Sequence, residues 1–294
     1  MTIAQNTLLA PYTTFHIGGP ADFFIVSHSI EELLESVAFA KEKSLPFFIL
    51  GTGANILIGD KGFRGVVIKN EAKKISWEGN LVTAESGETI ADLIHLTVER
   101  GFSGFEHFAG IPSSVGGALW QNLHFLSPDR SETKYIGDIV DHARIITESG
   151  EIKTVGKEYF HFGYDASILH EVQDIVLSAT FILTSESTAI LAQRVEANLS
   201  WRKQKHPENA TSCSAGSVFK KIEGHGAGRL IEQVGLKGHQ IGGAKISEKH
   251  ANFIINMGNA TASDVRQLIS LVQQTIQEQL GLPLETEISL IGEF

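Results

Sequence analysis

The chain has 294 residues, and its hydrophobic fraction of 42% is enough for the core of one large domain or of two ordinary ones. The formal net charge of -10 argues against a nucleic-acid-binding protein, because phosphate backbones are bound by clustered Lys and Arg. The single cysteine, Cys213, allows no internal disulfide, and no Cys or His residues have zinc-ligand spacing. We therefore expect no metal site and a reducing, cytoplasmic environment.

The N-terminal segment predicts neither secretion nor a membrane anchor. Residues 1–15 contain no basic region that is followed by an apolar run. Nowhere in the chain do about 18 apolar residues follow one another, which is the length that a membrane-spanning helix needs. We expect no membrane association.

The first half of the chain predicts helices that alternate with short strands. Apolar residues recur with helical spacing over 29–43 and 90–100, so both segments should form amphipathic helices. Short apolar runs bounded by glycine, or paired across a turn, predict strands and hairpins. These are expected at 46–50, 56–58, 65–68, 75–84, 145–155 and 174–183. Between them, Pro128 and Asp129 predict a loop over 121–134.

The second half predicts two long helices and a final strand. A connecting helix is expected over 185–201, and a second helix over 264–280, capped by Ser263 or Thr261. The strand should cover 285–291. Such a mixture of strands and helices indicates an α+β fold.

Three glycine clusters are the first indication of a ligand. They are Ile17-Gly-Gly-Pro-Ala21, Gly51-Thr-Gly-Ala-Asn55 and Ile111-Pro-Ser-Ser-Val-Gly-Gly-Ala118. Glycine lets backbone N–H groups approach an anion closely, so consecutive amides can surround a pyrophosphate. One such cluster is more often an ordinary turn. Three clusters, none in the order of a Rossmann or P-loop site, favour a dinucleotide held between loops.

A longer series of motifs makes the sequence recognisable. In chain order, the motifs span 14–21, 50–57, 61–67, 110–118, 214–220, 227–232, 235–238, 241–244, 247–253 and 284–292. Through them the sequence resembles the UDP-N-acetylenolpyruvoylglucosamine reductases over nearly its whole length. The short spacing after Phe219-Lys220 is similar to the compact form of that family.

The resemblance implies a fold and an activity. The fold is an FAD-binding domain of the vanillyl-alcohol-oxidase type in two α/β lobes, expected over 1–184, followed by a smaller α+β substrate-binding domain over 185–294. FAD would be bound non-covalently, with NADPH as co-substrate. The reaction is the reduction of UDP-N-acetylglucosamine enolpyruvate to UDP-N-acetylmuramate in peptidoglycan precursor synthesis. The partner is then a nucleotide sugar, and the protein is expected to be a cytoplasmic monomer or weak homo-oligomer.

The resemblance also implies which residues contact FAD. They come from the three glycine clusters and their flanks and from one arginine just after the predicted connecting helix. These residues are Ile17, Gly18, Gly19, Gly51, Thr52, Gly53, Ala54, Asn55, Ile56, Ile111, Pro112, Ser114, Val115, Gly116, Gly117 and Arg202.

Two residues match the catalytic positions of the family. Ser217, within Ala215-Gly-Ser-Val-Phe219, matches the serine that donates a proton to the enolate. A serine is a poor acid in water, so this role requires a relay and a dry site. Glu287 matches the glutamate that polarises the substrate carboxylate. The residues alone leave the choice between Glu285 and Glu287 open, since both would face one side of a strand.

Substrate contacts are implied for Lys205, Lys220, Lys221 and His250. Cationic donors at these positions would bind the diphosphate and sugar region. Without the family motifs each would be read as a surface residue, because Lys is almost never fully buried.

Three places depart from the family pattern: the usual asparagine and proline after Phe219-Lys220 are Lys221 and Ile222, and the stretch after the second glycine pair reads Gln121-Asn-Leu-His-Phe125. The third departure bears most on the chemistry. The motif that normally carries an arginine after its tyrosine reads Phe162-Gly-Tyr-Asp-Ala-Ser167, so Asp165 would repel the developing negative charge. In one interpretation another cation replaces the arginine, with Lys221, Arg130 and His124 as candidates. In the other, the protein keeps FAD and has changed its substrate chemistry.

Two further alternatives stay open at this stage. The first is an oxidase on the same FAD domain, in which flavin is often attached covalently. The position of Cys213 in the C-terminal half disfavours that attachment. The second is a flavin-binding protein without enzyme activity, which would hold FAD but show no NADPH-dependent bleaching.

Overall fold

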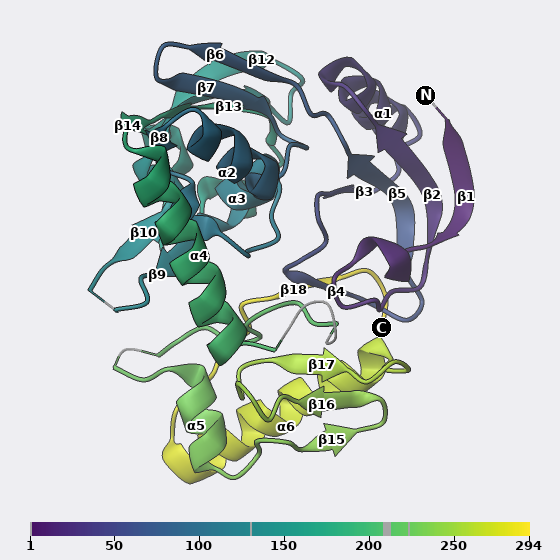
Figure 1. Cartoon of the computed structure of the whole chain (residues 1–294). Coiled ribbons are helices and arrows are strands. Elements are labelled where there is room, and N and C mark those ends of the chain that lie inside the picture. The colour runs from purple at the N-terminus through teal and green to yellow at the C-terminus, as the bar shows by residue number, and fades with distance from the viewer. Residues whose placement is uncertain (1, 130, 208–212, 223) are drawn as a thin grey trace.

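The computed structural model describes residues 2–129, 131–207, 213–222 and 224–294. Arg130, one candidate for the missing cation, lies outside these residues. Figure 1 shows three parts: a first lobe at the upper right, a second lobe at the upper left and a C-terminal part below. The fold class predicted from the sequence, α+β with an FAD-binding domain in two lobes, is confirmed.

The first lobe is a four-stranded sheet covered by α1 (Ile30–Glu42). The first pair of strands is antiparallel and the others are parallel. Leu33 and Val37 of α1 are buried against strand residues such as Ile68, which explains the apolar face of this helix. In sheet order the strands are β1 (Ile3–Leu8), β2 (Pro20–Ser27), β5 (Phe63–Asn70) and β3 (Phe47–Leu50).

The second lobe is a five-stranded antiparallel sheet with a cluster of helices on one face (Figure 1). The strands are, in sheet order, β12 (Ile152–Gly156), β11 (Val140–Ile146), β13 (Ile175–Ile182), β7 (Leu81–Glu85) and β6 (Ile75–Glu78). The helices are α2 (Ile90–Glu99), α3 (Val115–Gln121) and α4 (Thr188–Lys205). Small strand pairs are β9 (His124–Leu126) with β10 (Thr133–Tyr135), and β8 (Phe102–Ser103) with β14 (Thr184–Ser185). Phe105, Phe108 and Phe181 form the centre of its core.

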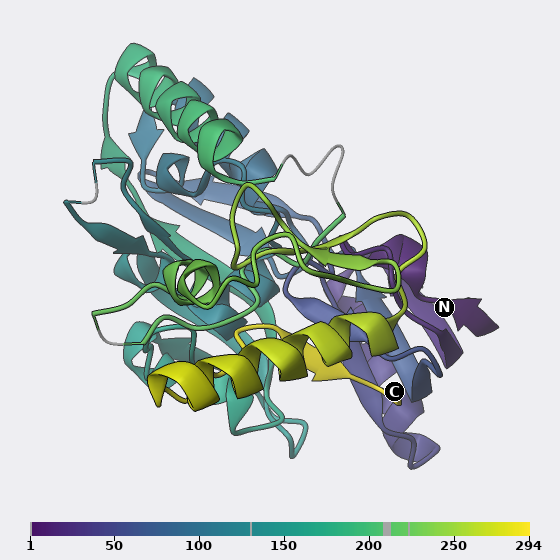
Figure 2. The same ribbon diagram turned by 90° about the horizontal axis from the view of Figure 1, so that it is seen from below.

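The C-terminal part packs two helices on a small antiparallel sheet. Figure 2 shows α6 lying across the outer side of this part, seen from below. Its core also contains Phe15, Ile17 and Leu57 from the first lobe, so the two parts share one apolar core. The elements are α5 (Ala227–Gln233), α6 (Ala262–Leu280), β15 (Gln240–Ile241), β16 (Ala244–Ile246) and β17 (Ile254–Asn256).

The end of the chain returns to the first lobe. There, β18 (Ser289–Ile291) pairs in parallel with β4 (Ile56–Ile58). The carboxylate of Asp60 accepts hydrogen bonds from the backbone N–H groups of Ala262 at 2.7 Å and Ser263 at 2.9 Å. These are free donors in the first turn of α6, so a first-lobe residue caps a helix of the C-terminal part.

The predicted boundary after residue 184 stays a prediction. The structure describes α4 as packed on the second lobe, where Asn198 Nδ2 donates to the carbonyl of Glu106 at 3.2 Å. Arg194 is also 3.1 Å from the buried carboxylate of Glu106. By these contacts the connecting helix lies with the lobe that precedes it.

Several secondary-structure predictions were wrong or incomplete. Residues 121–134, expected to be a loop, contain the β9–β10 hairpin, and only Ser289–Ile291 of the predicted final strand is a strand. The α3 helix was missed because Gly116 and Gly117 disfavour helix. It forms because Ser114 caps it and Leu119 is buried.

The Asp60 cap allows a test of the link between the parts. We expect Asp60→Ala to lower the free energy of unfolding by about 1–2 kcal/mol, since it leaves two donors of α6 without their acceptor. Asp141→Ala is the control, because Asp141 is exposed and pairs only with its neighbour His142. Urea unfolding followed by circular dichroism measures both, and equal stabilities of the two variants would contradict the role of the cap.

Candidate active site

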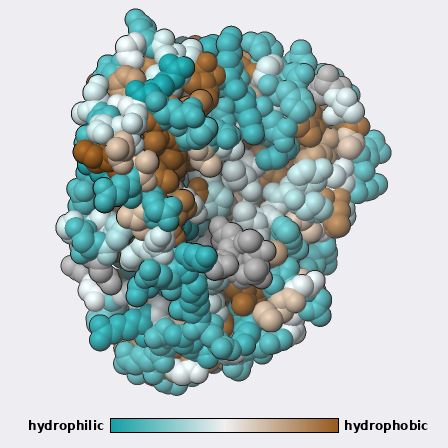
Figure 3. Space-filling model, viewed as in Figure 1, coloured by the Kyte–Doolittle hydropathy of each residue, from teal (hydrophilic) through white to brown (hydrophobic). Residues whose placement is uncertain are grey.

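A large cavity lies where the two lobes and the C-terminal part meet. It encloses about 1460 Å³ and is lined by residues from all three parts. On the face shown in Figure 3, the surface is mostly hydrophilic, with apolar side chains gathered toward the recessed centre. The volume exceeds the roughly 300–1,000 Å³ typical of a pocket for one small ligand. The cavity therefore has room for a dinucleotide together with a second molecule.

Two glycine clusters face each other across one wall of the cavity. A Cβ on Gly51 would lie 2.4 Å from Ser114 Oγ, so only glycine fits there. Gly53 has φ of +69°, and a Cβ on it would lie 2.3 Å from the carbonyl oxygen of Tyr12. Lys69, which the sequence analysis missed, donates from Nζ to the Gly51 carbonyl at 2.5 Å. Close packing against Ser114 and Tyr12, together with the Lys69 hydrogen bond, therefore fixes the conformation of the Gly51 loop.

This loop presents backbone donors without acceptors. Within the described part of the chain, the N–H groups of Thr52, Gly53, Ala54 and Asn55 make no hydrogen bond. Consecutive free amides of this kind form an anion-binding concavity. At the other cluster the amides of Val115, Gly116 and Gly117 already donate to Glu88, Ser86 and Ser114. The free donors therefore lie on the Gly51 loop.

Arg202 of α4 is a half-buried cation that lines the same cavity. Burial lowers the pKa of its guanidinium to about 10. Its neighbour is the Phe125 ring, 6.0 Å from the guanidinium carbon, and no carboxylate of the described residues lies within ion-pair distance. A desolvated arginine without an acidic partner suits a phosphate. The free amides and this cation thus fit the diphosphate of FAD.

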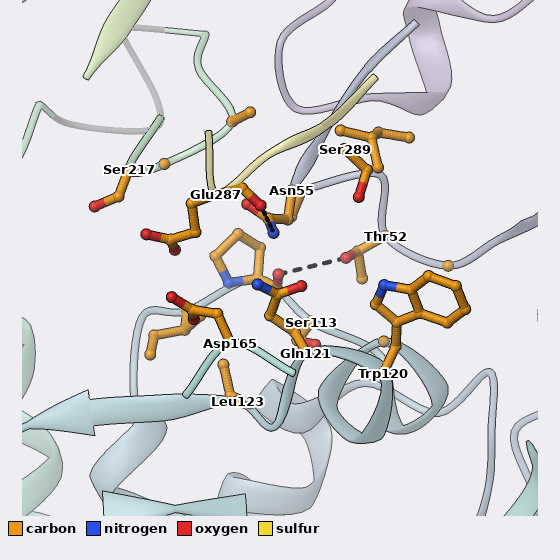
Figure 4. A pocket seen from close by; sticks show the side chains of 18 of the residues that line it. Thr52, Asn55, Ser113, Trp120, Gln121, Leu123, Asp165, Ser217, Glu287 and Ser289 are labelled. Carbon is orange, nitrogen blue, oxygen red and sulfur yellow. Dashed lines mark hydrogen bonds between the residues drawn. The ribbon is translucent and has the colours of Figure 1, made fainter. Parts of the chain in front are cut away.

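The two residues expected to be catalytic come together in the cavity. The N–H of Glu287 donates to the carbonyl of Val218 at 2.8 Å, which joins its segment to the loop of Ser217. The side-chain amide of Asn55 donates to the Glu287 carbonyl at 3.2 Å. In Figure 4, Ser217 and Glu287 lie on the same side of the cavity, with Asp165 opposite. The structure thus brings 217 and 287 to one place.

The expectation that Glu285 and Glu287 face the same side is wrong. The chain bends at 287–288, so residues 285–287 do not form a continuous strand. Glu285 is exposed and its carboxylate is 3.3 Å from Lys220 Nζ, whereas Glu287 lines the cavity. Of the two glutamates, only Glu287 therefore lies where it can contact a ligand in the cavity.

Asp165 lies beside one of the cations considered as a replacement. His124 Nδ1 is 3.3 Å from Asp165 Oδ1, and Lys221 Nζ lies 4.6 Å from the centre of the Tyr164 ring. Burial lowers the pKa of His124, and the Asp165 charge opposes that shift. The pKa of Glu287 is raised well above its ordinary value by burial and then by Asp165, against the attraction of Lys220 and Lys221. The site therefore holds two carboxylates where the family pattern has a carboxylate and an arginine.

Not every residue expected at the site lines the cavity. Gly18 and Gly19 serve close packing, since a Cβ on Gly19 would lie 2.5 Å from the N atom of Gly62. Lys205 is exposed at the end of α4. The residues outside the lining are Ile17, Gly18, Gly19, Val115, Lys205 and Lys220. Their roles in binding stay predictions.

The remaining expected residues line the cavity, together with some that were missed. The former are Gly51, Thr52, Gly53, Ala54, Asn55, Ile56, Ile111, Pro112, Ser114, Gly116, Gly117, Arg202, Ser217, Lys221, His250 and Glu287. Trp120, which Figure 4 shows at the edge of the cavity, was missed. It is 41% exposed, and its ring centre lies 4.6 Å from that of His170. His206 was also missed, and burial together with Arg202 lowers its pKa to about 3. An exposed tryptophan after a glycine cluster was the available signal.

Comparison with known proteins first defines a class. Residues 21–156 match the model of an FAD binding domain, which together with the loop geometry makes this a flavoprotein. Residues 206–291 match the C-terminal domain of UDP-N-acetylenolpyruvoylglucosamine reductase.

Full-length relatives then give the family. The chain is 40% identical over 294 residues to the UDP-N-acetylenolpyruvoylglucosamine reductase of Lactobacillus delbrueckii subsp. bulgaricus, covering 100% of this chain and 96% of the relative. It is 39% identical over 291 residues to that of Clostridium perfringens, covering 99% and 93%. The crystal structure of the Thermus caldophilus enzyme matches with a TM-score of 0.84 and 32% identity over 99% of both chains. The chain belongs to the UDP-N-acetylenolpyruvoylglucosamine reductase family.

Two kinds of feature are absent from the described residues. None of their helices combines the length and the apolar character needed to cross a membrane. In the same residues, no group of three or more His, Cys, Asp or Glu side chains could hold a metal ion.

Gly53 provides a test of the cofactor loop. We expect Gly53→Ala to abolish retention of FAD, because the methyl group would displace the loop that carries the free amides. Gly79→Ala is the matched control: Gly79 has φ of +60°, but a Cβ there would meet nothing within 4 Å. Both variants should lose about 1–2 kcal/mol of stability from left-handed backbone strain. The measurement is flavin absorbance per protein after gel filtration, and equal flavin content in both would contradict the assignment.

Proposed function

We propose that the protein is an FAD-dependent reductase that uses NADPH to convert UDP-N-acetylglucosamine enolpyruvate to UDP-N-acetylmuramate for peptidoglycan synthesis. The family membership supports this substrate. The observation that carries the proposal for this chain is the meeting of Ser217 and Glu287 in one cavity with the free amides of the Gly51 loop. A reductase needs its proton donor and its carboxyl group beside the substrate, and it needs the cofactor-binding loop in the same cavity.

The residues of the Gly51 loop and Arg202 would hold the diphosphate of FAD. When bound, FAD supplies the two-electron reduction of the enolpyruvyl double bond, at the expense of NADPH. The chain itself orients the two molecules and excludes water. Apolar lining residues such as Leu123 and Phe125 make the wall of the cavity dry, which strengthens each polar contact inside it.

Ser217 would donate the proton that completes the reduction. Its backbone is fixed on both sides, since Ser217 forms a β-bridge with Phe253 and the N–H of Val218 donates to the carbonyl of Asn252 at 2.8 Å. A hydroxyl held this firmly can meet the enolate carbon at a constant position. General acid catalysis of this kind contributes about a hundredfold to ten-thousandfold in rate.

Glu287 would meet the carboxylate of the substrate. Because its pKa is raised well above the ordinary value, the carboxyl group remains protonated at higher pH than an exposed glutamate. A neutral acid donates a hydrogen bond to a carboxylate, whereas an ionised one would repel it. Lys221 and His250, which line the cavity, would bind the charged and polar groups of the nucleotide sugar, with Lys205 and Lys220 outside the lining.

We further propose that the protein acts in the cytoplasm as a monomer or weak homo-oligomer, without nucleic acid or membrane as a partner. The supply of NADPH supports that compartment. The division into an FAD-binding domain over 1–184 and a substrate-binding domain over 185–294 also stays a proposal. It is supported by the position of the substrate-facing Ser217 and His250, which both follow α4.

Anaerobic kinetics test the function. The purified protein should oxidise NADPH only when enolpyruvyl-UDP-N-acetylglucosamine is added. Ser217→Ala should lower this turnover by at least a hundredfold and leave the reduction of flavin by NADPH unchanged, because only the proton donor is lost. Ser149→Ala, in an exposed hairpin turn, is the control.

The alternatives predict other results. If NADPH bleaches the flavin and the substrate does not restore its colour, the substrate chemistry is different. Consumption of oxygen with an alcohol or sugar would indicate an oxidase. Flavin that precipitates with the protein in acid would be covalently attached, which would contradict non-covalent binding of FAD.

A further inference from the structure

Asp165 occupies a turn that is fixed from two sides. The carbonyl of Gly163 accepts a hydrogen bond from Asn122 Nδ2 at 2.8 Å, and Ser167 Oγ donates to the carbonyl of Trp120 at 2.8 Å. Both bonds attach the turn to the C-terminal end of α3. Asp165 itself has φ of +52°, a left-handed conformation that aspartate and asparagine tolerate better than most residues. The position of its carboxylate is therefore determined by the fold.

The carboxylate of Asp165 is buried with few polar neighbours. The residue is 2% exposed and lines the cavity, and the groups beside its oxygens are the hydroxyl of Tyr164 and, at 3.3 Å, Nδ1 of His124. A buried carboxylate with so few partners is costly, and asparagine would suit the left-handed turn equally well, so the turn alone does not require the charge. Such a group points to a function in the cavity that it faces.

The charges around Asp165 come from several elements. Beside it are His124 of β9, at 3.3 Å, and Tyr164 of the same turn. From the C-terminal segment comes Glu287, whose carboxylate is directed into the same part of the cavity in Figure 4. The other titratable groups that act on Asp165 or Glu287 are His170, Lys220 and Lys221.

These charges do not balance if both carboxylates are ionised. Lys221 is exposed and lies over the Tyr164 ring, and Lys220 pairs with Glu285 on the outside. His124 is mostly neutral at neutral pH, because burial lowers its pKa. Two ionised carboxylates in a dry cavity would thus face each other without a buried cation, so one of them keeps its proton.

We propose that Asp165 and Glu287 form an acid pair across the cavity, in which the Asp165 carboxyl group beside His124 keeps Glu287 in its neutral acid form. In this pair Asp165 is a positioning residue: it acts on the substrate only through Glu287. The inference rests on the proposed function for its substrate, and it deepens that function. In this pair the protonated carboxyl group of Glu287 takes the place of the arginine side chain that the family pattern has at the site.

The acid pair gives Glu287 a defined chemical task. A neutral carboxylic acid in a dry site can donate a hydrogen bond to the substrate carboxylate and strengthen it as enolate charge develops. Glu287 keeps its proton throughout, and the proton that adds to carbon comes from Ser217. A neutral hydrogen-bond donor then stabilises the developing enolate charge, so the cavity needs no additional cation.

Asp165→Asn tests the pair with little change in shape. The variant removes the negative charge beside Glu287, so the pKa of Glu287 falls and its acid form is lost at lower pH. We expect the high-pH limb of kcat/KM for the enolpyruvyl substrate to move down by on the order of one pH unit. Glu278→Gln, an exposed charge on α6 that bonds Gln274, changes the net charge equally and should leave the limb unchanged. If the high-pH limb of kcat/KM does not move in Asp165→Asn, the proposal is overturned.

Infrared spectroscopy gives a second measurement that needs no turnover. In the FAD-loaded parent protein at neutral pH, a carbonyl stretch of a protonated carboxyl group should be present and should vanish in Glu287→Gln. In Asp165→Asn the same band should titrate at lower pH, even if that variant is inactive. Absence of the band from the parent protein overturns the acid pair.

The two measurements also separate this inference from the proposed function. A parent protein that shows the band but no substrate-dependent NADPH oxidation contradicts the function and supports the acid pair. Turnover without the band supports the function and contradicts the pair. Thermal unfolding adds a further expectation: Asp165→Asn should raise the midpoint, because a buried unpaired charge is removed.

Discussion

The parallel pairing of β18 with β4 fixes the relation between the Gly51 loop and the Glu287 segment. Asn55 directly precedes β4, and Glu287 lies just before β18, so a register that aligns the two strands also aligns these two residues. The Asn55 amide closes the link on the Glu287 carbonyl. Reducing chemistry needs the donor and the acceptor of electrons in contact. One strand pair therefore supplies the constraint on which the geometry of the site depends.

Much of this arrangement could be predicted from the residues. The Gly51 loop was identified from its glycines because a loop that exposes consecutive amides needs residues without Cβ. The long helices followed from apolar periodicity, and Thr261, one of two proposed caps, is the cap of α6. Local chemistry determined each of these features, so a local pattern was sufficient to find them.

Other features depend on long-range contacts and could not be found in this way. The α3 helix contains two glycines and is stabilised by burial against the second lobe, which no local propensity reveals. The difference between Glu285 and Glu287 arises where the chain bends to follow the return of β18. The position of His124 beside Asp165 joins a small hairpin to a distant turn. In each case a contact between residues far apart in the chain determines the local structure, and no local sequence pattern records that contact.

The return of β18 also bears on the order in which the protein folds. During synthesis β4 leaves the ribosome long before β18, so until then the outer edge of β4 has no strand partner, and Leu57 lacks much of the apolar core that it shares with the C-terminal part. The Gly51 loop adjoins this open edge, and its contacts with Tyr12, Lys69 and Ser114 all come from parts of the chain made before β18. A nascent chain can therefore shape this loop early, whereas the contacts of Asn55 with Glu287 and Ser289 form only when the last strand pairs.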